Sequence, residues 1–127
     1  MDTNQQPASR QQSPYAFERR QPRFKLEVDI RVYPRHASAV RGYTVDISES
    51  GISAILKMEV PLGQVVQLEF TLPRGTINVY ATVRQRSAFR YGFEFLGGSP
   101  ELETVRATCH QRAIEDFMNV ESQGRGQ

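Results

Sequence analysis

Apolar and polar residues alternate along most of the chain between residues 25 and 95. In residues 25–33, four apolar residues alternate with four charged ones, which predicts a strand with one buried face. The same period of two, interrupted by Pro and Gly turns, recurs over residues 43–47, 52–56, 66–72, 77–83 and 89–95. In the last run, Gly92 indicates a bulge or a close backbone approach. The pattern predicts six short strands.

The period changes after Gly97 and Gly98. Ser99 is suited to cap a helix and Pro100 to occupy its first position. Apolar residues then follow at spacings of three and four, at Leu102, Val105, Cys109, Ala113 and Phe117. We expect one amphipathic helix whose apolar stripe plugs a barrel. The fold class is therefore all-β dominated, a small six-stranded antiparallel β-barrel with one C-terminal α-helix.

The two ends of the 127-residue chain lack this periodicity. Their composition predicts a disordered arm over residues 1–14 and a disordered tail over residues 121–127, with one domain over residues 15–120. No stretch approaches the ~20 apolar residues of a membrane-spanning helix, and the arm contains no apolar core of a signal peptide. We expect a cytoplasmic protein without membrane insertion.

Composition and single residues exclude several kinds of chemistry. The lone Cys109 cannot form an internal disulfide, and its place on the apolar stripe predicts packing in the core. His36 and His110 have no partner at a metal-ligand spacing, so no metal or cofactor is expected. Catalytic motifs are absent from the sequence, and we do not expect an enzyme.

An arginine pair stands where the polar arm meets the first strand, with Arg19 and Arg23 four residues apart and Pro22 stiffening the backbone before Arg23. A guanidinium fork can donate two hydrogen bonds to guanine O6 and N7, lie flat on the base or grip a phosphate. Arg20 is a supporting candidate, because it lacks the four-residue spacing to Arg23. Alone, such a pair is typical of a solvated segment.

A second polar motif, Asp46-x-Ser48-x-x-Gly51, ends another strand pattern. Asp and Ser bond to backbone in turns and Gly adopts positive φ, so the motif also fits a plain strand connection. The Asp46 carboxylate can, however, accept hydrogen bonds from guanine N1 and N2, which arginine cannot do. The co-occurrence of both motifs, in this order and separation, favours a joint guanine site.

The two motifs together resemble those of the PilZ domain family, bacterial receptors for the second messenger cyclic di-GMP. The resemblance covers about residues 17–117 and implies a barrel with a terminal helix. It implies that the arginines contact guanine and phosphate, that the aspartate accepts from guanine, that the serine bonds to phosphate or base, and that the glycine lets the backbone turn against the ligand. The residues so assigned are Arg19, Arg20, Arg23, Asp46, Ser48 and Gly51. Arg84 and Arg86 would add contacts if their strand face points to the site.

We therefore expect a cyclic di-GMP receptor or adaptor that changes conformation or partner affinity on binding and acts on a protein effector in trans. The arm through Arg23 would become ordered around the ligand. One alternative is a ligand-independent adaptor, against which the intact motifs count. Another is a barrel that binds single-stranded nucleic acid through arginines and exposed aromatics such as Tyr43, Tyr80 or Tyr91. The net charge of only +2 counts against a nucleic-acid polymer as partner.

Overall fold

The computed structural model describes the backbone of residues 21–125 and, in the terminal helix, side chains as far as residue 119. Residues 21–125 contain seven strands and one helix, α2. Their bounds are β1 Phe24–Lys25, β2 Asp29–Tyr33, β3 Val40–Ile47, β4 Gly51–Leu56, β5 Val65–Leu72, β6 Gly75–Ser87, β7 Arg90–Phe95 and α2 Glu101–Arg125.

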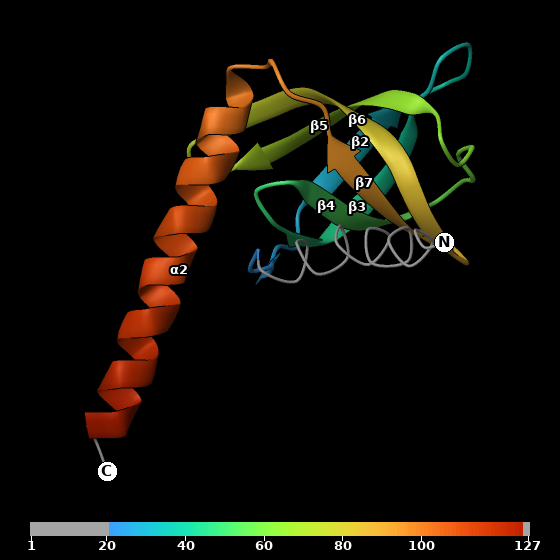
Figure 1. The fold of residues 1–127 in the computed structure, drawn as a ribbon. Coiled ribbons are helices and arrows are strands. Elements are labelled where there is room, and N and C mark those ends of the chain that lie inside the picture. The colour runs from blue at the N-terminus through green and yellow to red at the C-terminus, as the bar shows by residue number, and fades with distance from the viewer. Residues whose placement is uncertain (1–20, 126–127) are drawn as a thin grey trace, which may run out of the picture.

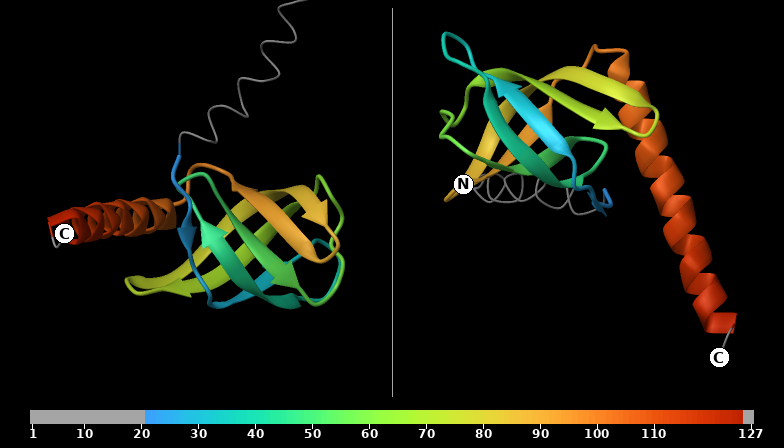
Figure 2. Two further views of the ribbon diagram at one scale, coloured as in Figure 1. Left: turned by 90° about the horizontal axis from the view of Figure 1, so that it is seen from below. Right: turned by 180° about the vertical axis from the view of Figure 1, so that it is seen from behind.

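Six of these strands close into an antiparallel barrel, visible from three sides in Figures 1 and 2. Hydrogen-bonded neighbours follow the order β3-β2-β5-β6-β7-β4, and β4 pairs back with β3 to complete the ring. The seventh strand, β1, adds a two-residue pairing to the end of β3. The predicted fold class, a six-stranded barrel with one C-terminal helix, is confirmed.

The core is formed by the inward faces of the alternating runs. Ile77, Val79, Ala81 and Val83 of β6 are buried together, and β5 contributes Leu68 from the opposite side of the same ladder. Successive side chains of a strand point to opposite faces, so the apolar residues of one run share the barrel interior. This burial supplies the main stabilisation, at about 25 cal/mol for each Å² of apolar surface removed from water.

One expected exposed aromatic belongs to this core. Tyr91 is fully buried, and its hydroxyl accepts a hydrogen bond from the backbone amide of Val60 at 3.0 Å. Tyr43 and Tyr80 are exposed, as the nucleic-acid alternative required. The placement of Tyr91 on the surface was wrong, because its position in the alternation puts it on the inner face of β7.

The first expected strand, over residues 25–33, is divided into β1 and β2. At the division, the Thr44 hydroxyl donates to the carbonyl of Leu26 and accepts from the amide of Val28 at 2.9 Å. Direct backbone hydrogen bonds to β3 continue beside it, from the Leu26 amide to the Val45 carbonyl at 3.0 Å and from the Thr44 amide to the Val28 carbonyl at 2.8 Å. Three residues, 26–28, thus lie opposite two of β3, Thr44 and Val45, and β1 becomes a separate, short element at the end of β3.

Helix α2 begins as the sequence predicts, with the hydroxyl of Ser99 accepting from the amide of Glu101 at 3.3 Å. The same hydroxyl donates to the Glu101 side chain and lowers the pKa of that carboxyl. Val105 and Cys109 are buried against the barrel, but Phe117, at 64% exposure, is not. The helix leaves the barrel and projects past it (Figure 1). It extends as far as Arg125, through part of the segment predicted to be a disordered tail.

Candidate functional site

A bulge in β3 turns Asp46 out of the barrel. Thr44 pairs with Ala54, but the next pair in the β3–β4 ladder is Asp46 with Ser53, so Val45 is an extra residue on one strand. Without this shift Asp46 would share the inner face with the buried Thr44. The bulge instead leaves Asp46 on the outer wall, with its side chain 22% exposed.

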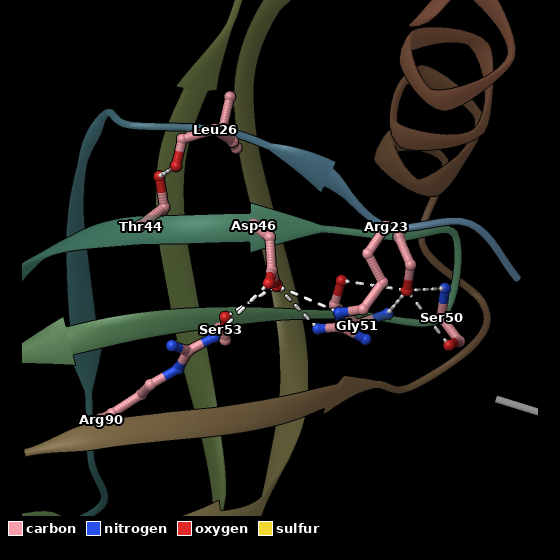
Figure 3. Close-up of polar contacts among 9 residues, drawn as sticks. Arg23, Leu26, Thr44, Asp46, Ser50, Gly51, Ser53 and Arg90 are labelled. Carbon is pink, nitrogen blue, oxygen red and sulfur yellow. Dashed lines mark hydrogen bonds and ion pairs between the residues drawn. The ribbon is translucent and has the colours of Figure 1, made fainter. Parts of the chain in front are cut away.

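Asp46 is the centre of a polar cluster (Figure 3). Its Oδ1 accepts hydrogen bonds from Nε and Nη2 of Arg23, at 3.1 and 2.9 Å, and from the hydroxyl of Ser53 at 2.7 Å. Its Oδ2 lies 3.5 Å from Nη2 of Arg90, an ion pair beyond ordinary hydrogen-bond length. One carboxylate oxygen is therefore crowded with donors, while the other has a single loose partner among the described residues.

Strand β1 brings Arg23 to this carboxylate. Phe24 pairs with Ile47 and is buried, and Lys25 pairs with Asp46. Helix α2 secures the strand, because Arg112 donates from Nη1 to the Lys25 carbonyl at 3.0 Å and lies 5.7 Å from the centre of the Phe24 ring. Arg23 is thus held beside Asp46 by the buried residue that follows it.

Ser48 and Gly51 form the turn between β3 and β4. The Ser48 amide donates to the Gly51 carbonyl at 2.8 Å, and the Ser48 hydroxyl accepts from the Gly51 amide at 3.2 Å. Ser48 is buried, with its hydroxyl directed into the turn. Its direct role here is to shape the turn that follows Asp46.

Gly51 is required for a reason other than the one its turn motif indicated. Its φ is not in the positive region, so the predicted left-handed turn is wrong. A Cβ at this position would lie 2.3 Å from the carbonyl oxygen of Phe93, on the neighbouring strand β7. Glycine therefore allows β4 and β7 to approach closely beside the site.

The outer wall next to Asp46 is lined by small residues. Across the sheet, Asp46 pairs with Ser53, and Ser53 pairs in turn with Gly92. Gly92 lies opposite a second bulge, which falls between Val83 and Gln85 of β6. The bulge that Gly92 indicated is thus present, although it belongs to the partner strand. Ser53 and Gly92 therefore form a floor of small residues beside the carboxylate, bordered at Gly92 by the Gln85 side chain.

The structure brings together some of the predicted site residues. Arg23 and Asp46 are in direct contact, and Ser48 and Gly51 lie in the adjoining turn. Arg19 and Arg20 lie outside the described residues.

Sequence reasoning missed Ser53 and Arg90. Ser53 could have been found by counting the β3–β4 pairing outward from the turn. Nothing in the sequence separates Arg90 from Arg84 and Arg86, which pair with Glu94 at 2.6 Å and Glu59 at 2.8 Å and not with Asp46.

Residues 21–125 contain no cluster of His, Cys, Asp or Glu able to hold a metal ion. Cys109 is buried, and burial raises the pKa of its thiol to about 11, which makes it a weak nucleophile at neutral pH. No helix in the described residues is both long and apolar enough to cross a membrane.

Comparison with known protein families identifies the family to which the chain belongs. The sequence model of the PilZ domain family matches residues 17–110. The chain belongs to the PilZ domain family. The match contains both motifs and the barrel, and it ends within helix α2. None of the curated proteins matches this chain.

Solved structures with similar folds include three of known bacterial proteins. Inhibitor of motility (MotI/DgrA) of Bacillus subtilis is 18% identical, with a TM-score of 0.64, over 75% of this chain and 51% of that one. The PilZ domain of YcgR from Escherichia coli, with c-di-GMP, is 19% identical over 77% and 95%, with a TM-score of 0.57. MrkH of K. pneumonia, as a c-di-GMP complex, is 15% identical over 82% and 54%, with a TM-score of 0.56. This chain spans about half the length of MotI/DgrA and MrkH.

Proposed function

We propose that this chain is a receptor for cyclic di-GMP. The observation that carries the proposal is the meeting of Arg23 with Asp46 at 2.9 Å on the outer wall of the barrel, beside a floor of small residues. A guanidinium and a carboxylate side by side offer the donors and acceptors that guanine needs. Membership in the PilZ family, and the c-di-GMP complexes of YcgR and MrkH, support the same ligand.

Each site residue has a role in this proposal. Asp46 accepts from guanine N1 and N2, and Arg23 donates to a base edge or stacks on its face. Arg19 and Arg20, from the arm, contact the second guanine and the phosphates. Ser48 and Gly51 shape the turn beside Asp46, and the Ser48 hydroxyl reaches a phosphate or base only if the turn adjusts.

The energy of these contacts is sufficient for a signalling affinity. Each well-placed arginine contact is worth ~1 to 3 kcal/mol, and micromolar binding corresponds to about 8 kcal/mol. Arg23 must share or give up its hydrogen bonds to Asp46 when guanine binds, which makes the free energy of binding less favourable. Ordering of the arm opposes binding further.

We propose in addition that binding orders the arm and changes the affinity for a protein effector in trans. The arm joins the barrel through β1, an element of two residues, so its attachment can respond to a ligand held by Arg23. Amide hydrogen exchange in residues 15–24 should slow when cyclic di-GMP is added. Unchanged exchange in a protein that binds would place the switch elsewhere.

Calorimetric titration with cyclic di-GMP tests the proposed function, with GTP and a single-stranded oligonucleotide as controls. We expect binding of cyclic di-GMP alone. Arg19→Ala, Arg23→Ala and Asp46→Ala should each weaken it by about tenfold or more with little change in melting temperature. Arg31→Ala, on β2 and facing Glu69 and Arg41 in the ladders, removes the same charge away from the site and serves as the control. Binding of the oligonucleotide instead would favour the nucleic-acid alternative.

A further inference from the structure

Arg90 is the first residue of β7, and its side chain is 52% exposed. In Figure 3 it reaches from that strand towards Asp46, from the side opposite Arg23. Its Nη2 lies 3.5 Å from Asp46 Oδ2, while Arg23 and Ser53 bond to Oδ1. The two arginines therefore flank one carboxylate and contact different oxygens of it.

Two arginines of the neighbouring strand β6 are paired with carboxylates other than Asp46. Arg84 bonds to Glu94 through Nε at 2.6 Å, and Arg86 bonds to Glu59 through Nη2 at 2.8 Å. Among the described residues, the only polar contact of Arg90 is its long ion pair with Asp46. A charged side chain with one loose, exposed partner loses little when that partner is taken by another group.

Binding of guanine at Asp46 would compete with Arg90. Oδ1 already accepts three hydrogen bonds, so Oδ2 is the oxygen with free acceptor capacity for a guanine donor. A donor at Oδ2 would occupy the position that Arg90 Nη2 approaches. The displaced guanidinium would then lie beside the base, above Ser53 and Gly92, where the nearest side chain to Gly92 is that of Gln85, which is flexible.

We propose that Arg90 is a third ligand-binding arginine of this site, an inference that rests on the proposed function. In this structure its Nη2 lies beside Asp46 Oδ2, at 3.5 Å. With cyclic di-GMP bound it moves from Oδ2 to the ligand, where its planar fork stacks on guanine or donates to base or phosphate oxygens. The charges favour this exchange, because Arg23, Arg90 and Asp46 carry one net positive charge between them and the ligand carries two negative phosphates.

Titration of four proteins with cyclic di-GMP in one buffer tests the proposal: wild type, Arg90→Ala, Arg90→Lys and Arg84→Ala. We expect Arg90→Ala to bind about tenfold more weakly and Arg90→Lys at least about fivefold more weakly, since an ammonium cannot stack or fork. Arg84→Ala is the matched control, because it removes an exposed arginine from the neighbouring strand, and it should stay within about twofold of wild type. Melting temperatures of all four proteins confirm that each is folded. Should Arg90→Ala prove unstable, Arg90→Lys decides.

The outcomes separate the two proposals. Losses smaller than about fivefold in both Arg90 variants, or tighter binding because a competitor for Asp46 has been removed, would overturn the role of Arg90 alone. A loss in Arg84→Ala equal to that in Arg90→Ala would also overturn it, since the effect would then be general charge attraction. A wild-type protein that does not bind cyclic di-GMP would overturn the proposed function together with this inference.

Discussion

Two walls of the same barrel are built differently. The β5–β6 ladder keeps one unbroken register from Val65 paired with Thr82 to Leu72 paired with Gly75. The wall formed by β3, β4 and β7 contains one register shift, in the β3–β4 ladder, and is bordered by a second, in the β6–β7 ladder. Both walls bury apolar side chains, but the irregular wall also turns Asp46 outward beside small residues. The alternation of apolar and polar residues builds the core, and the register shifts build the candidate site.

A core substitution in the regular wall should give the largest effect and leave the site intact. Leu68 of β5 is fully buried. We expect Leu68→Ala to lower the free energy of unfolding by about 2 to 5 kcal/mol, because it removes buried methyl groups and leaves a cavity. Urea denaturation measures this loss. The affinity of the folded fraction for cyclic di-GMP should be unchanged, and a large loss of affinity would show that the two walls are not separable.

A substitution at Gly51, in the irregular wall, should affect both stability and ligand affinity. Gly51→Val should lower both stability, by about 1 to 3 kcal/mol, and ligand affinity, because its side chain would force β4 away from the Phe93 carbonyl. Gly92→Ala is the control, since its Cβ would lie 3.4 Å from the nearest atoms, which belong to the flexible Gln85 side chain. Thermal denaturation and titration of both variants should show the stability loss in Gly51→Val alone. Equal stability of the two variants would contradict the close approach.

Arg23→Lys should change affinity with little change in stability. The variant keeps the positive charge but loses the paired Nε and Nη2 donors. We expect a loss of ~1 to 3 kcal/mol in binding, roughly five- to a hundredfold. The free energy of unfolding should change by less than about 1 kcal/mol, because an exposed ion pair contributes little. A lysine variant that binds within about twofold of wild type would reduce the role of Arg23 to charge alone.

Most of the regular wall could be predicted from the sequence, because the period of two is sufficient to assign faces. The period of two did not predict the structure where a side-chain hydrogen bond or a neighbouring strand changes the local backbone. Residues 25–33 fit one strand pattern, yet their ladder with β3 is interrupted opposite Thr44, whose hydroxyl bonds to Leu26 and Val28. The motif containing Gly51 is compatible both with positive φ and with close packing, and only the position of β7 decides between them.

The candidate site and helix α2 were likewise predicted only in part from the sequence. Arg23 and Asp46 were predicted from their chemistry, whereas Arg90 was missed because its neighbour across the sheet depends on strand order. The helical period continues through Phe117, but periodicity identifies a face and not where the supporting barrel ends. That residue is therefore exposed, although it lies on the predicted apolar stripe.

The smallest expected effect concerns Cys109, where the helix packs on the barrel. Burial is the main cause of the rise in its pKa from 9.0 to about 11, and the nearby charge of Glu49 adds to it. The folded state thus favours the neutral thiol, so this contribution to stability is complete below pH 9 and is lost as the pH rises through about 11. Chemical denaturation at pH 8 and pH 10.5 should show a fall in stability that is smaller in Cys109→Ala. An equal fall in both proteins would assign the pH dependence to other groups.

We propose that Asp46 recognises guanine on the irregular wall. Discrimination between cyclic di-GMP and cyclic di-AMP tests this role most directly. Adenine lacks the N1 and N2 donors that a carboxylate accepts, so wild type should prefer cyclic di-GMP by about tenfold or more. Asp46→Ala should lose most of this preference, mainly through weaker binding of cyclic di-GMP. Calorimetric titration of both proteins with both dinucleotides gives the four affinities. Equal affinity of wild type for the two ligands, or an undiminished preference in Asp46→Ala, would contradict the account.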